Sequence, residues 1–294
     1  MKHRAKGILS LMVATVIWGS AFIAQSVGMD HIGPMTFQAV RCTLGGLFLI
    51  PVVFLFEKEK NQFLQNWKNP KLWKTGFVCG AALFLAAGLQ QIGLVYTTAG
   101  KAGFITAMYI VMVPILGVFL GKRPTPACWF SVVLAVAGLY LLSYVGNSKI
   151  NVGDICLMIS ALFFAIQITL IDRLAGNLDG IRLNSIQALV CGLLSAIAMA
   201  AIEEPVISNI LACWLPLSYA GILSIGVAYS LQIVGQKHLE PTPASLIMSL
   251  ESVYAVLFGW LLLHERMTTY ELFGCVLVFA GVILSQIPVK ESHD

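Results

Sequence analysis

Ten long apolar stretches, separated by short hydrophilic links, occupy nearly all of this 294-residue chain. A helix needs about 20 mostly apolar residues to cross the roughly 30 Å of hydrocarbon in a bilayer. Hydrophobic residues make up 58% of the chain and charged residues only 11%, whereas soluble domains carry about 25% charged residues. The sequence therefore predicts an all-α integral membrane protein with ten transmembrane helices, at 7–27, 33–56, 72–96, 99–121, 125–145, 153–172, 182–202, 210–236, 242–263 and 269–288.

The links leave no room for a soluble domain. The longest, Glu57–Lys71, is too short to bury a core of its own. The seven cysteines all fall inside predicted spans without paired spacing, so we interpret them as apolar packing residues. The five histidines lie at span ends or in links, and neither HExxH nor GxSxG occurs. We therefore expect no metal site, no cofactor and no enzymatic activity.

Lysine and arginine residues are distributed unevenly between the two sides. If the N-terminus is cytoplasmic, 14 of the 18 fall in cytoplasmic links. Only Lys101, Lys149 and Arg266 fall on the opposite side, and Arg41 lies within a span. Cytoplasmic links carry an excess of basic residues. This bias predicts a multi-pass protein of the cytoplasmic membrane with both termini in the cytoplasm, and does not suggest nucleic acid binding.

The chain contains an internal repeat. Gly7–Trp18 aligns with Gly153–Phe164 at an offset of 146 residues, and matches continue in the same order over five predicted spans. Later in each half, an offset of 142 residues pairs Gln90 with Gln232, Gly93 with Gly235, Tyr109 with Glu251, and Gly117 with Gly259. We therefore predict a first five-helix repeat at 1–147 and a second at 148–294.

An odd number of spans in each repeat has a topological consequence. The second repeat must enter the membrane in the opposite direction to the first. Inverted repeats are the usual construction of secondary transporters, in which one bundle rocks against another and exposes a shared central site to alternate sides. We therefore expect two inverted five-helix repeats around a central cavity.

Several short segments resemble EamA-type members of the drug/metabolite transporter superfamily. They are Trp18–Phe22 (WGSAF), Phe37–Arg41 (FQAVR), Leu89–Gly93 (LQQIG), Tyr96–Thr106 (YTTAGKAGFIT), Ser249–Val253 (SLESV), Gly259 and His264–Arg266 (HER). The resemblance covers the whole chain and is specific to the family, not to a substrate. It implies ten helices and the movement of small metabolites, most often export. Because no GxxxxGK[ST] motif occurs, we expect a gradient and not ATP to supply the energy.

The resemblance and the repeat together predict a secondary active transporter. We expect it to export a small metabolite, an amino acid or a related polar or amphipathic compound, by alternating access, with protons as the candidate coupling ion. An uptake symporter or exchanger for a sugar, vitamin or nucleotide is the alternative within transport. A passive pore, a membrane scaffold and an intramembrane enzyme are the rivals from other classes. The sequence leaves the substrate, flux direction, coupling ion and oligomeric state open.

Three charged residues in or near the spans are candidate site residues, because a charge near the bilayer centre costs at least about 2.5–3.5 kcal/mol. Glu251, well inside 242–263, is either a proton-coupling or substrate-binding carboxylate or a structural link between helices. Arg41 either contacts an anionic substrate group, snorkels outward or braces Asp30. Lys101 is either an interfacial anchor or a cavity residue.

Five uncharged residues complete the predicted site. Gln90 and Gln232 occupy corresponding places in the two repeats, and amides in a membrane either line a wet cavity or connect helices. Tyr109, which corresponds to Glu251, should meet it near the central axis. Thr106 lies one helical turn from Tyr109 on the same face. Trp18 lies too deep for an interfacial aromatic belt, so it either walls the cavity or fills space between helices.

Glycine and proline residues predict how some helices pack. Gly76 with Gly80, and Gly117 with Gly121, have the small-xxx-small spacing that allows close contact between helices. Pro114 removes a backbone donor within the fourth predicted span, so we expect a kink or hinge there.

Overall fold

The computed structural model describes residues 2–57, 63–122, 124–142, 150–263 and 268–286, and within these ranges the chain is helical without strands. The main helices are α1 (Lys2–Met29), α2 (Pro34–Phe56), α4 (Pro70–Leu94), α5 (Ala99–Ala107), α6 (Tyr109–Phe119), α7 (Pro126–Leu142), α8 (Val152–Leu174), α9 (Gly180–Ile202), α12 (Tyr229–Gln236), α13 (Pro241–Met248), α14 (Leu250–Leu263) and α15 (Thr269–Gln286). Shorter elements are α3 (Phe63–Trp67), α10 (Ile207–Ala212), α11 (Trp214–Ser218) and the π-helix η2 (Tyr219–Ala228).

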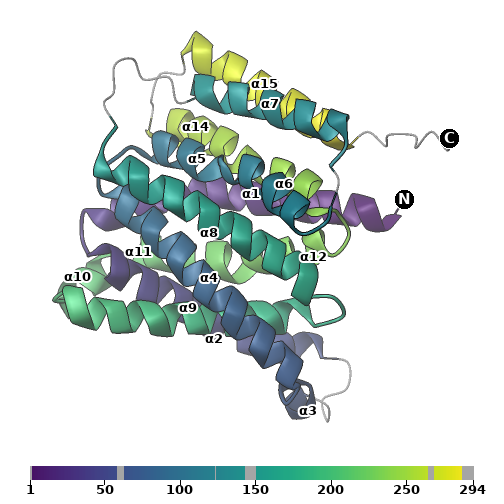
Figure 1. Ribbon diagram of the computed structural model, residues 1–294. Helices are drawn as coiled ribbons and strands as arrows, with labels where there is room; N and C mark the ends of the chain where they lie inside the picture. Colours follow the sequence, from purple (N-terminus) through teal and green to yellow (C-terminus); the bar gives the residue numbers. More distant parts are fainter. Residues whose placement is uncertain (1, 58–62, 123, 143–149, 264–267, 287–294) are drawn as a thin grey trace.

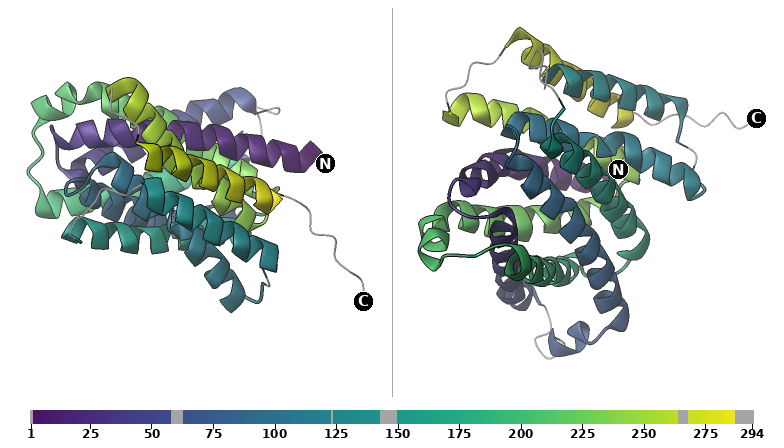
Figure 2. Two further views of the ribbon diagram at one scale, coloured as in Figure 1. Left: turned by 90° about the horizontal axis from the view of Figure 1, so that it is seen from above. Right: turned by 60° about the vertical axis from the view of Figure 1, so that its left-hand side comes forward.

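Each predicted span corresponds to one helix or to consecutive helical elements, up to four in the eighth span, 210–236. In the described ranges, nine helical segments are long and apolar enough to cross a membrane. The fifth predicted span corresponds to α7, which has 17 residues and is shorter than the others. The structure therefore supports a multi-pass helical protein and leaves the tenth crossing as a prediction. Figures 1 and 2 show α7 and α15 packed along each other as a separate layer.

Two of the spans are interrupted. The fourth breaks at Met108, between α5 and α6, and the ninth breaks at Ser249, between α13 and α14. The carbonyl oxygen of the residue at each break accepts a hydrogen bond from the backbone N–H three residues later, over 3.0 Å for Met108 and 3.1 Å for Ser249. Pro114 lies inside α6, six residues after the break at Met108, and the kink or hinge expected there stays a prediction. Residues 244–258, around the second break, contain no proline, so proline does not explain this shared feature.

The sequence repeat recurs as a repeated contact between α2 and α9. Glu203, after α9, accepts hydrogen bonds from the backbone N–H groups of Met35 (2.8 Å) and Thr36 (2.8 Å) and from the Thr36 hydroxyl (2.6 Å), at the start of α2. Glu57, after α2, forms an ion pair with Arg182 at the start of α9. Adding 146 to positions 36 and 57 gives 182 and 203. Corresponding residues thus fasten both ends of this helix pair.

Two glycine crossings repeat in the same way. A Cβ atom added to Gly7 would lie 3.0 Å from the carbonyl oxygen of Gly235, so α1 and α12 approach very closely. A Cβ atom added to Gly153 would lie 2.8 Å from the carbonyl oxygen of Gly93, so α8 and α4 do the same. Gly7 and Gly153 correspond by the 146-residue offset, and Gly93 and Gly235 by the 142-residue offset. The two crossings lie at opposite ends of the molecule.

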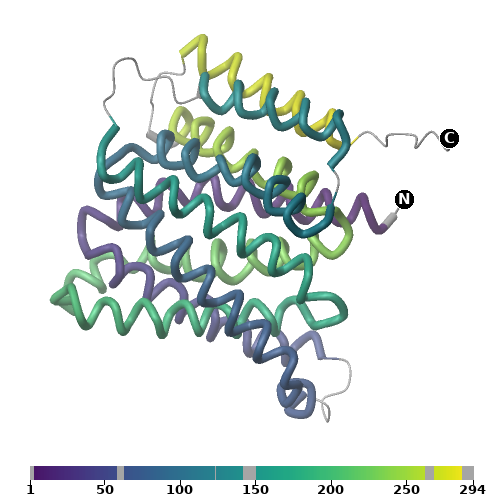
Figure 3. The backbone as a smooth tube through the Cα atoms, viewed as in Figure 1, coloured from purple at the N-terminus to yellow at the C-terminus, as the bar shows by residue number. Residues whose placement is uncertain are grey.

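We name these two ends for the chain termini. Arg4 donates to the carbonyl oxygen of Gln286 at 2.6 Å, so the first and last helices share one end, the terminal end. The opposite end, where α8 begins, is the distal end. Figure 3 shows α1 and α8 running in opposite directions between these ends. Lys101 lies at the distal end, whereas Lys149 and His264–Arg266 lie outside the described residues.

The two predicted glycine faces differ in outcome. Cβ atoms added to Gly76 and Gly80 would lie 2.4 Å and 2.7 Å from atoms of α9, so this face packs closely against a helix, as predicted. The prediction for Gly117 and Gly121 is wrong. A Cβ atom on Gly117 would meet nothing closer than 3.7 Å, and Gly121 has no neighbour within 4 Å. With a φ of +82°, Gly121 instead forms the left-handed turn that ends α6.

Candidate functional site

A small cavity lies near the middle of the bundle, where both repeats contribute side chains. Its walls come from α1 (Trp18, Phe22, Gln25), α2 (Arg41), α4 (Gln90), α6 (Tyr109), α8 (Phe164, Ile168), η2 (Ser224), α12 (Tyr229, Gln232), α13 (Met248) and α14 (Glu251). Its volume is about 30 Å³, which holds water but no metabolite. The central cavity therefore has room for a water molecule but not for a metabolite in this conformation.

Glu251 and Tyr109 meet directly in the cavity wall. The Tyr109 hydroxyl donates to Glu251 Oε1 at 3.0 Å, and both residues are buried. Tyr109 is the first residue of α6 and Glu251 the second of α14, so each follows a helix break. The positive end of the α14 dipole therefore faces the carboxylate. This pair of corresponding residues joins the two halves of the chain at the cavity.

Arg41 is held in the cavity wall by two neutral amides. Its Nε and Nη2 donate to Gln38 Oε1 at 2.8 Å and 2.5 Å, and its Nη1 donates to Gln25 Oε1 at 2.5 Å. Arg41 is 2% exposed and Asp30 is exposed, so Arg41 neither snorkels outward nor braces Asp30. Among the described residues, no carboxylate forms an ion pair with Arg41. Its charge is therefore available to an anionic ligand group.

Two polar atoms of the cavity wall have no partner among the described residues. They are the Trp18 indole nitrogen, a donor, and Gln232 Oε1, an acceptor. Trp18 packs edge-on against Tyr229, with ring centroids 4.9 Å apart. The Gln232 amide nitrogen donates to Gln167 Oε1 at 3.1 Å, which leaves its oxygen free. Because buried polar atoms are normally paired, this donor and this acceptor are positions where water or a ligand can bind.

Gln90 faces the cavity and its neighbour does not. The Gln90 amide donates to the Thr106 hydroxyl at 3.3 Å, and Thr106 itself lies behind the cavity wall. Gln91 points elsewhere and donates to the carbonyl oxygen of Gln25 at 3.3 Å. Thr106 therefore orients Gln90 and, in this conformation, does not contact the cavity.

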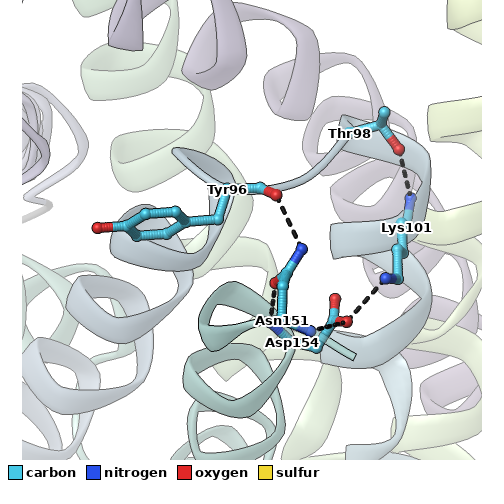
Figure 4. Close-up of polar contacts among 5 residues, drawn as sticks. All are labelled: Tyr96, Thr98, Lys101, Asn151 and Asp154. Atoms are coloured by element: carbon cyan, nitrogen blue, oxygen red, sulfur yellow. Dashed lines mark hydrogen bonds and ion pairs between the residues drawn. The ribbon is translucent and has the colours of Figure 1, made fainter. Parts of the chain in front are cut away.

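Lys101 lies outside the central cavity. Its ammonium group forms an ion pair of 2.7 Å with Asp154 at the distal end (Figure 4). The sequence gives no indication of this partner, because Asp154 stands at the start of a span and is 53 residues away. Lys101 therefore does not line the central cavity in this conformation, and its role as an interfacial anchor stays a prediction.

Several cavity residues were missed, although helical spacing could have found some of them. Phe22 and Gln25 lie four and seven residues after Trp18, on the same face of α1. Tyr229 lies three residues before Gln232 on α12. Ser224 lies in the π-helix, where this spacing does not apply.

The π-helix η2 gives the second half of the chain an irregular wall. Its wider turns leave carbonyl groups that an amide from another helix can reach. Asn184 of α9 donates to the carbonyl oxygens of Ile225 (2.8 Å) and Gly226 (3.0 Å) and to the Ser230 hydroxyl (2.9 Å). Short π-helical turns are frequent at functional sites. Here the π-helix contributes Ser224 to the central cavity.

A second, larger cavity opens at the terminal end. This terminal vestibule has a volume of about 670 Å³ and contains Arg4, Lys122, Arg173, His238 and Glu240 in its wall. It also reaches Val113, which lies one helical turn from Tyr109 in the central cavity. The wall of the terminal vestibule therefore comes within about one helical turn of the wall of the central cavity.

Comparison with known proteins assigns the chain to a family of transporters. The sequence profile of the EamA-like transporter family matches residues 5–144 and again residues 151–286. An uncharacterized transporter of Archaeoglobus fulgidus is 32% identical, with 96% of this chain and 86% of the relative aligned. The threonine/homoserine exporter RhtA of Escherichia coli K12 is 25% identical over 97% and 92% of the two chains. The transporter YoaV of Bacillus subtilis is 23% identical over 95% and 96%.

A solved crystal structure has the same fold, with a TM-score of 0.78 over 96% of each chain and 18% sequence identity. The two profile matches coincide with the two halves that carry the repeated contacts described above. The protein is thus a multi-pass membrane protein and belongs to the EamA-like transporter family, whose domain occurs in it twice.

Proposed function

We propose that the protein is a secondary active transporter that exports a small zwitterionic metabolite, an amino acid or a close relative, across the cytoplasmic membrane. The observation that carries this proposal is that two residues of opposite charge, Arg41 and Glu251, line the same cavity. A guanidinium group suits a carboxylate, and a carboxylate suits an ammonium group. Trp18, Tyr229 and Phe164 supply apolar surface for a side chain. The relative RhtA, named a threonine/homoserine exporter, agrees with this substrate class.

The repeated contacts support transport by alternating access. Equivalent glycine crossings lie at opposite ends, and equivalent glutamates fasten α2 to α9. We infer two inverted five-helix repeats, 1–147 and 148–294, with ten crossings and both termini in the cytoplasm. Rocking of such repeats exposes one central site to each side in turn. The terminal vestibule then faces the cytoplasm, from which an exported substrate enters.

Glu251 is the coupling residue in this proposal. A single carboxylate cannot bind a proton and hold a substrate ammonium group as its counter-ion at the same time. Proton entry from outside therefore displaces the substrate amine, and release of that proton inside prepares the site for another substrate molecule. The hydrogen bond from Tyr109 keeps Glu251 on the cavity axis in both states.

Reconstitution into vesicles tests the coupling. Glu251→Gln should lower the uptake that a pH gradient drives by at least about tenfold, because a neutral amide does not titrate. Glu204→Gln, which changes an exposed glutamate at the distal end, is the matched control and should behave as the parent. The coupling role is wrong if Glu251→Gln transports as well as the parent under every pH gradient.

Arg41→Gln tests the substrate contact separately. Glutamine stands at the corresponding position 187 of the second repeat, so the helix pair accommodates it. We expect kcat/KM for amino acids to fall about 10- to 100-fold, because a charged hydrogen bond to the carboxylate is lost. Counterflow with imposed gradients distinguishes export from uptake. Flux that neither saturates nor shows counterflow would identify a passive pore and exclude a carrier.

A further inference from the structure

The distal end contains a polar cluster that the transport site does not use. Lys101, in the first turn of α5, forms its 2.7 Å ion pair with Asp154, in the first turn of α8. The side chains are 19% and 9% exposed, respectively. Because α5 belongs to the first half of the chain and α8 to the second, this ion pair joins the two halves at their distal ends.

Helix caps fix both partners of the ion pair (Figure 4). The Thr98 hydroxyl accepts a hydrogen bond from the backbone N–H of Lys101 at 3.4 Å. Asn151 and Asp154 form a capping box, with each side chain accepting from the backbone N–H of the other at 3.0 Å. The Asn151 amide donates to the carbonyl oxygen of Tyr96 at 3.1 Å. The ion pair therefore joins the N-terminal ends of two capped helices.

A buried apolar layer lies between this ion pair and the central cavity. Phe22, Ala102, Ile105, Leu157 and Ala255, from four different helices, pack together and are at most 6% exposed. Phe22 also lines the cavity, and Ala102 follows Lys101 in sequence. Passage from the cavity to the distal end therefore requires both the apolar layer and the ion pair to separate.

The terminal end has no equivalent of this ion pair. The repeat offsets relate Asp154 to Ile8 and Lys101 to Pro243, neither of which carries a charge. Other ion pairs lie at the terminal end. Lys122–Asp172 is more exposed, at 43% and 19%, and Arg182–Glu57, at 7% and 14%, joins α9 to the end of α2. The terminal end also contains the vestibule of about 670 Å³. The two ends thus share their glycine crossings, and the Lys101–Asp154 contact between α5 and α8 has no charged counterpart at the corresponding positions.

We propose that the Lys101–Asp154 ion pair, which has no counterpart in the repeat, is a latch that holds the distal end of the transport path closed, so that opening to the outside requires this pair to break. Partial burial strengthens the attraction between the two charges. The latch is also reversible for a physical reason. Asp154 Oδ1 has no partner among the described residues, so hydration of this atom on opening offsets part of the cost of separating the pair.

Hydrogen exchange of the full-length protein in lipid nanodiscs tests the latch. Lys101→Met and Asp154→Asn each remove one charge, and asparagine keeps an acceptor for the capping box. Each variant should raise backbone exchange in peptides covering 95–105 and 150–158 about tenfold, because losing one to two kcal/mol shifts an opening equilibrium about 5- to 30-fold. The double variant should resemble either single variant, since both remove the same contact.

Lys122→Met is the matched control, because it breaks the Lys122–Asp172 ion pair at the terminal end and should leave distal exchange unchanged. Lys101→Arg keeps the charge and should keep exchange near that of the parent. General destabilisation would instead raise exchange at both ends and lower the melting temperature. The latch is overturned if distal exchange stays at the parent level in both neutral variants, or rises equally at the two ends. Exchange reports opening independently of any substrate, so failure of the transport proposal would not mimic either result.

Discussion

The distal and terminal ends of the molecule show how duplicated halves diverge. At each end two helices cross at glycines, with a would-be Cβ atom within 3.0 Å of a facing carbonyl oxygen. The distal end adds the Lys101–Asp154 ion pair, which has no charged counterpart at the corresponding positions of the repeat, and the terminal end adds a vestibule of about 670 Å³. Backbone packing is therefore shared, while the polar contacts at the two ends differ. In the proposed mechanism, the symmetry provides two related states and this asymmetry selects between them.

The largest effect should come from breaking a shared crossing. A Cβ atom at position 153 would lie 2.7 Å from Tyr96 Cβ and 2.8 Å from the carbonyl oxygen of Gly93. Gly153→Val should therefore lower the free energy of unfolding by about 2–3 kcal/mol, because overpacking against backbone forces helices apart. Gly7→Val should cost a similar amount at the terminal end. Denaturant titration of the detergent-solubilised protein measures both.

Gly100→Val provides the control for these two substitutions, because no atom lies within 4 Å of a Cβ added there. We expect its stability to stay within about 1 kcal/mol of the parent, which allows for the difference in helix propensity between glycine and valine. If Gly7→Val is tolerated while Gly153→Val is not, the two crossings are not equivalent and the comparison fails at the level of packing.

A smaller effect should follow removal of the distal glutamate cap. Glu203→Ala removes three hydrogen bonds to the start of α2 and should reduce stability by about 1–2 kcal/mol, the usual range for a lost helix cap. Glu204→Ala, at an exposed neighbouring position, should change stability by less than about 0.5 kcal/mol. Equal effects of the two substitutions would show that the contact with α2 contributes nothing to stability.

The smallest effect concerns the pH dependence of the terminal end. Burial, followed by the charges of His3, Lys6 and Lys237, lowers the pKa of His238 from 6.5. Below pH 6.5 the unfolded chain then binds more protons than the folded one, so stability falls as the solution becomes acidic. His238→Gln should reduce the loss of melting temperature at acidic pH by on the order of 1 °C.

Comparing the variant with the parent at two pH values provides the control for His238→Gln. The melting temperatures of the variant and the parent should differ at pH 5 and agree at pH 8, where the parent histidine is neutral. A difference of the same size at both values would assign the effect to packing against α1, not to protonation.

Much of the fold could be predicted from hydropathy and from the repeat. Apolar runs locate each span, because a bilayer imposes one length on every crossing. The 142-residue offset predicts that Tyr109 and Glu251 lie close together, and in the structure they share a 3.0 Å hydrogen bond. The same reasoning could have found the glutamate contacts of α2 and α9, since Glu57 and Glu203 are 146 residues apart.

Contacts that break the repeat could not be predicted in this way. Lys101 and Asp154 have no charged counterparts in the other half, so symmetry gives no information about them. Arg41 is held by Gln25 and Gln38, and an arginine in a span gives no reason to prefer neutral amides over Asp30. The break at Ser249 has no proline to mark it. These features depend on tertiary packing that the linear pattern does not encode.

The paired helix breaks have a mechanical consequence. Tyr109 begins α6 and Glu251 is the second residue of α14, so each of these cavity side chains lies at the N-terminal end of a short helix, next to a break. Because these side chains adjoin the pivots at Met108 and Ser249, a tilt of α6 or α14 moves them little and moves the far ends of the two helices most. Those far ends are Phe119 at the terminal end and Leu263 at the distal end. Bending at the two breaks would therefore change the width of each end in turn while the Tyr109–Glu251 contact stays near the centre.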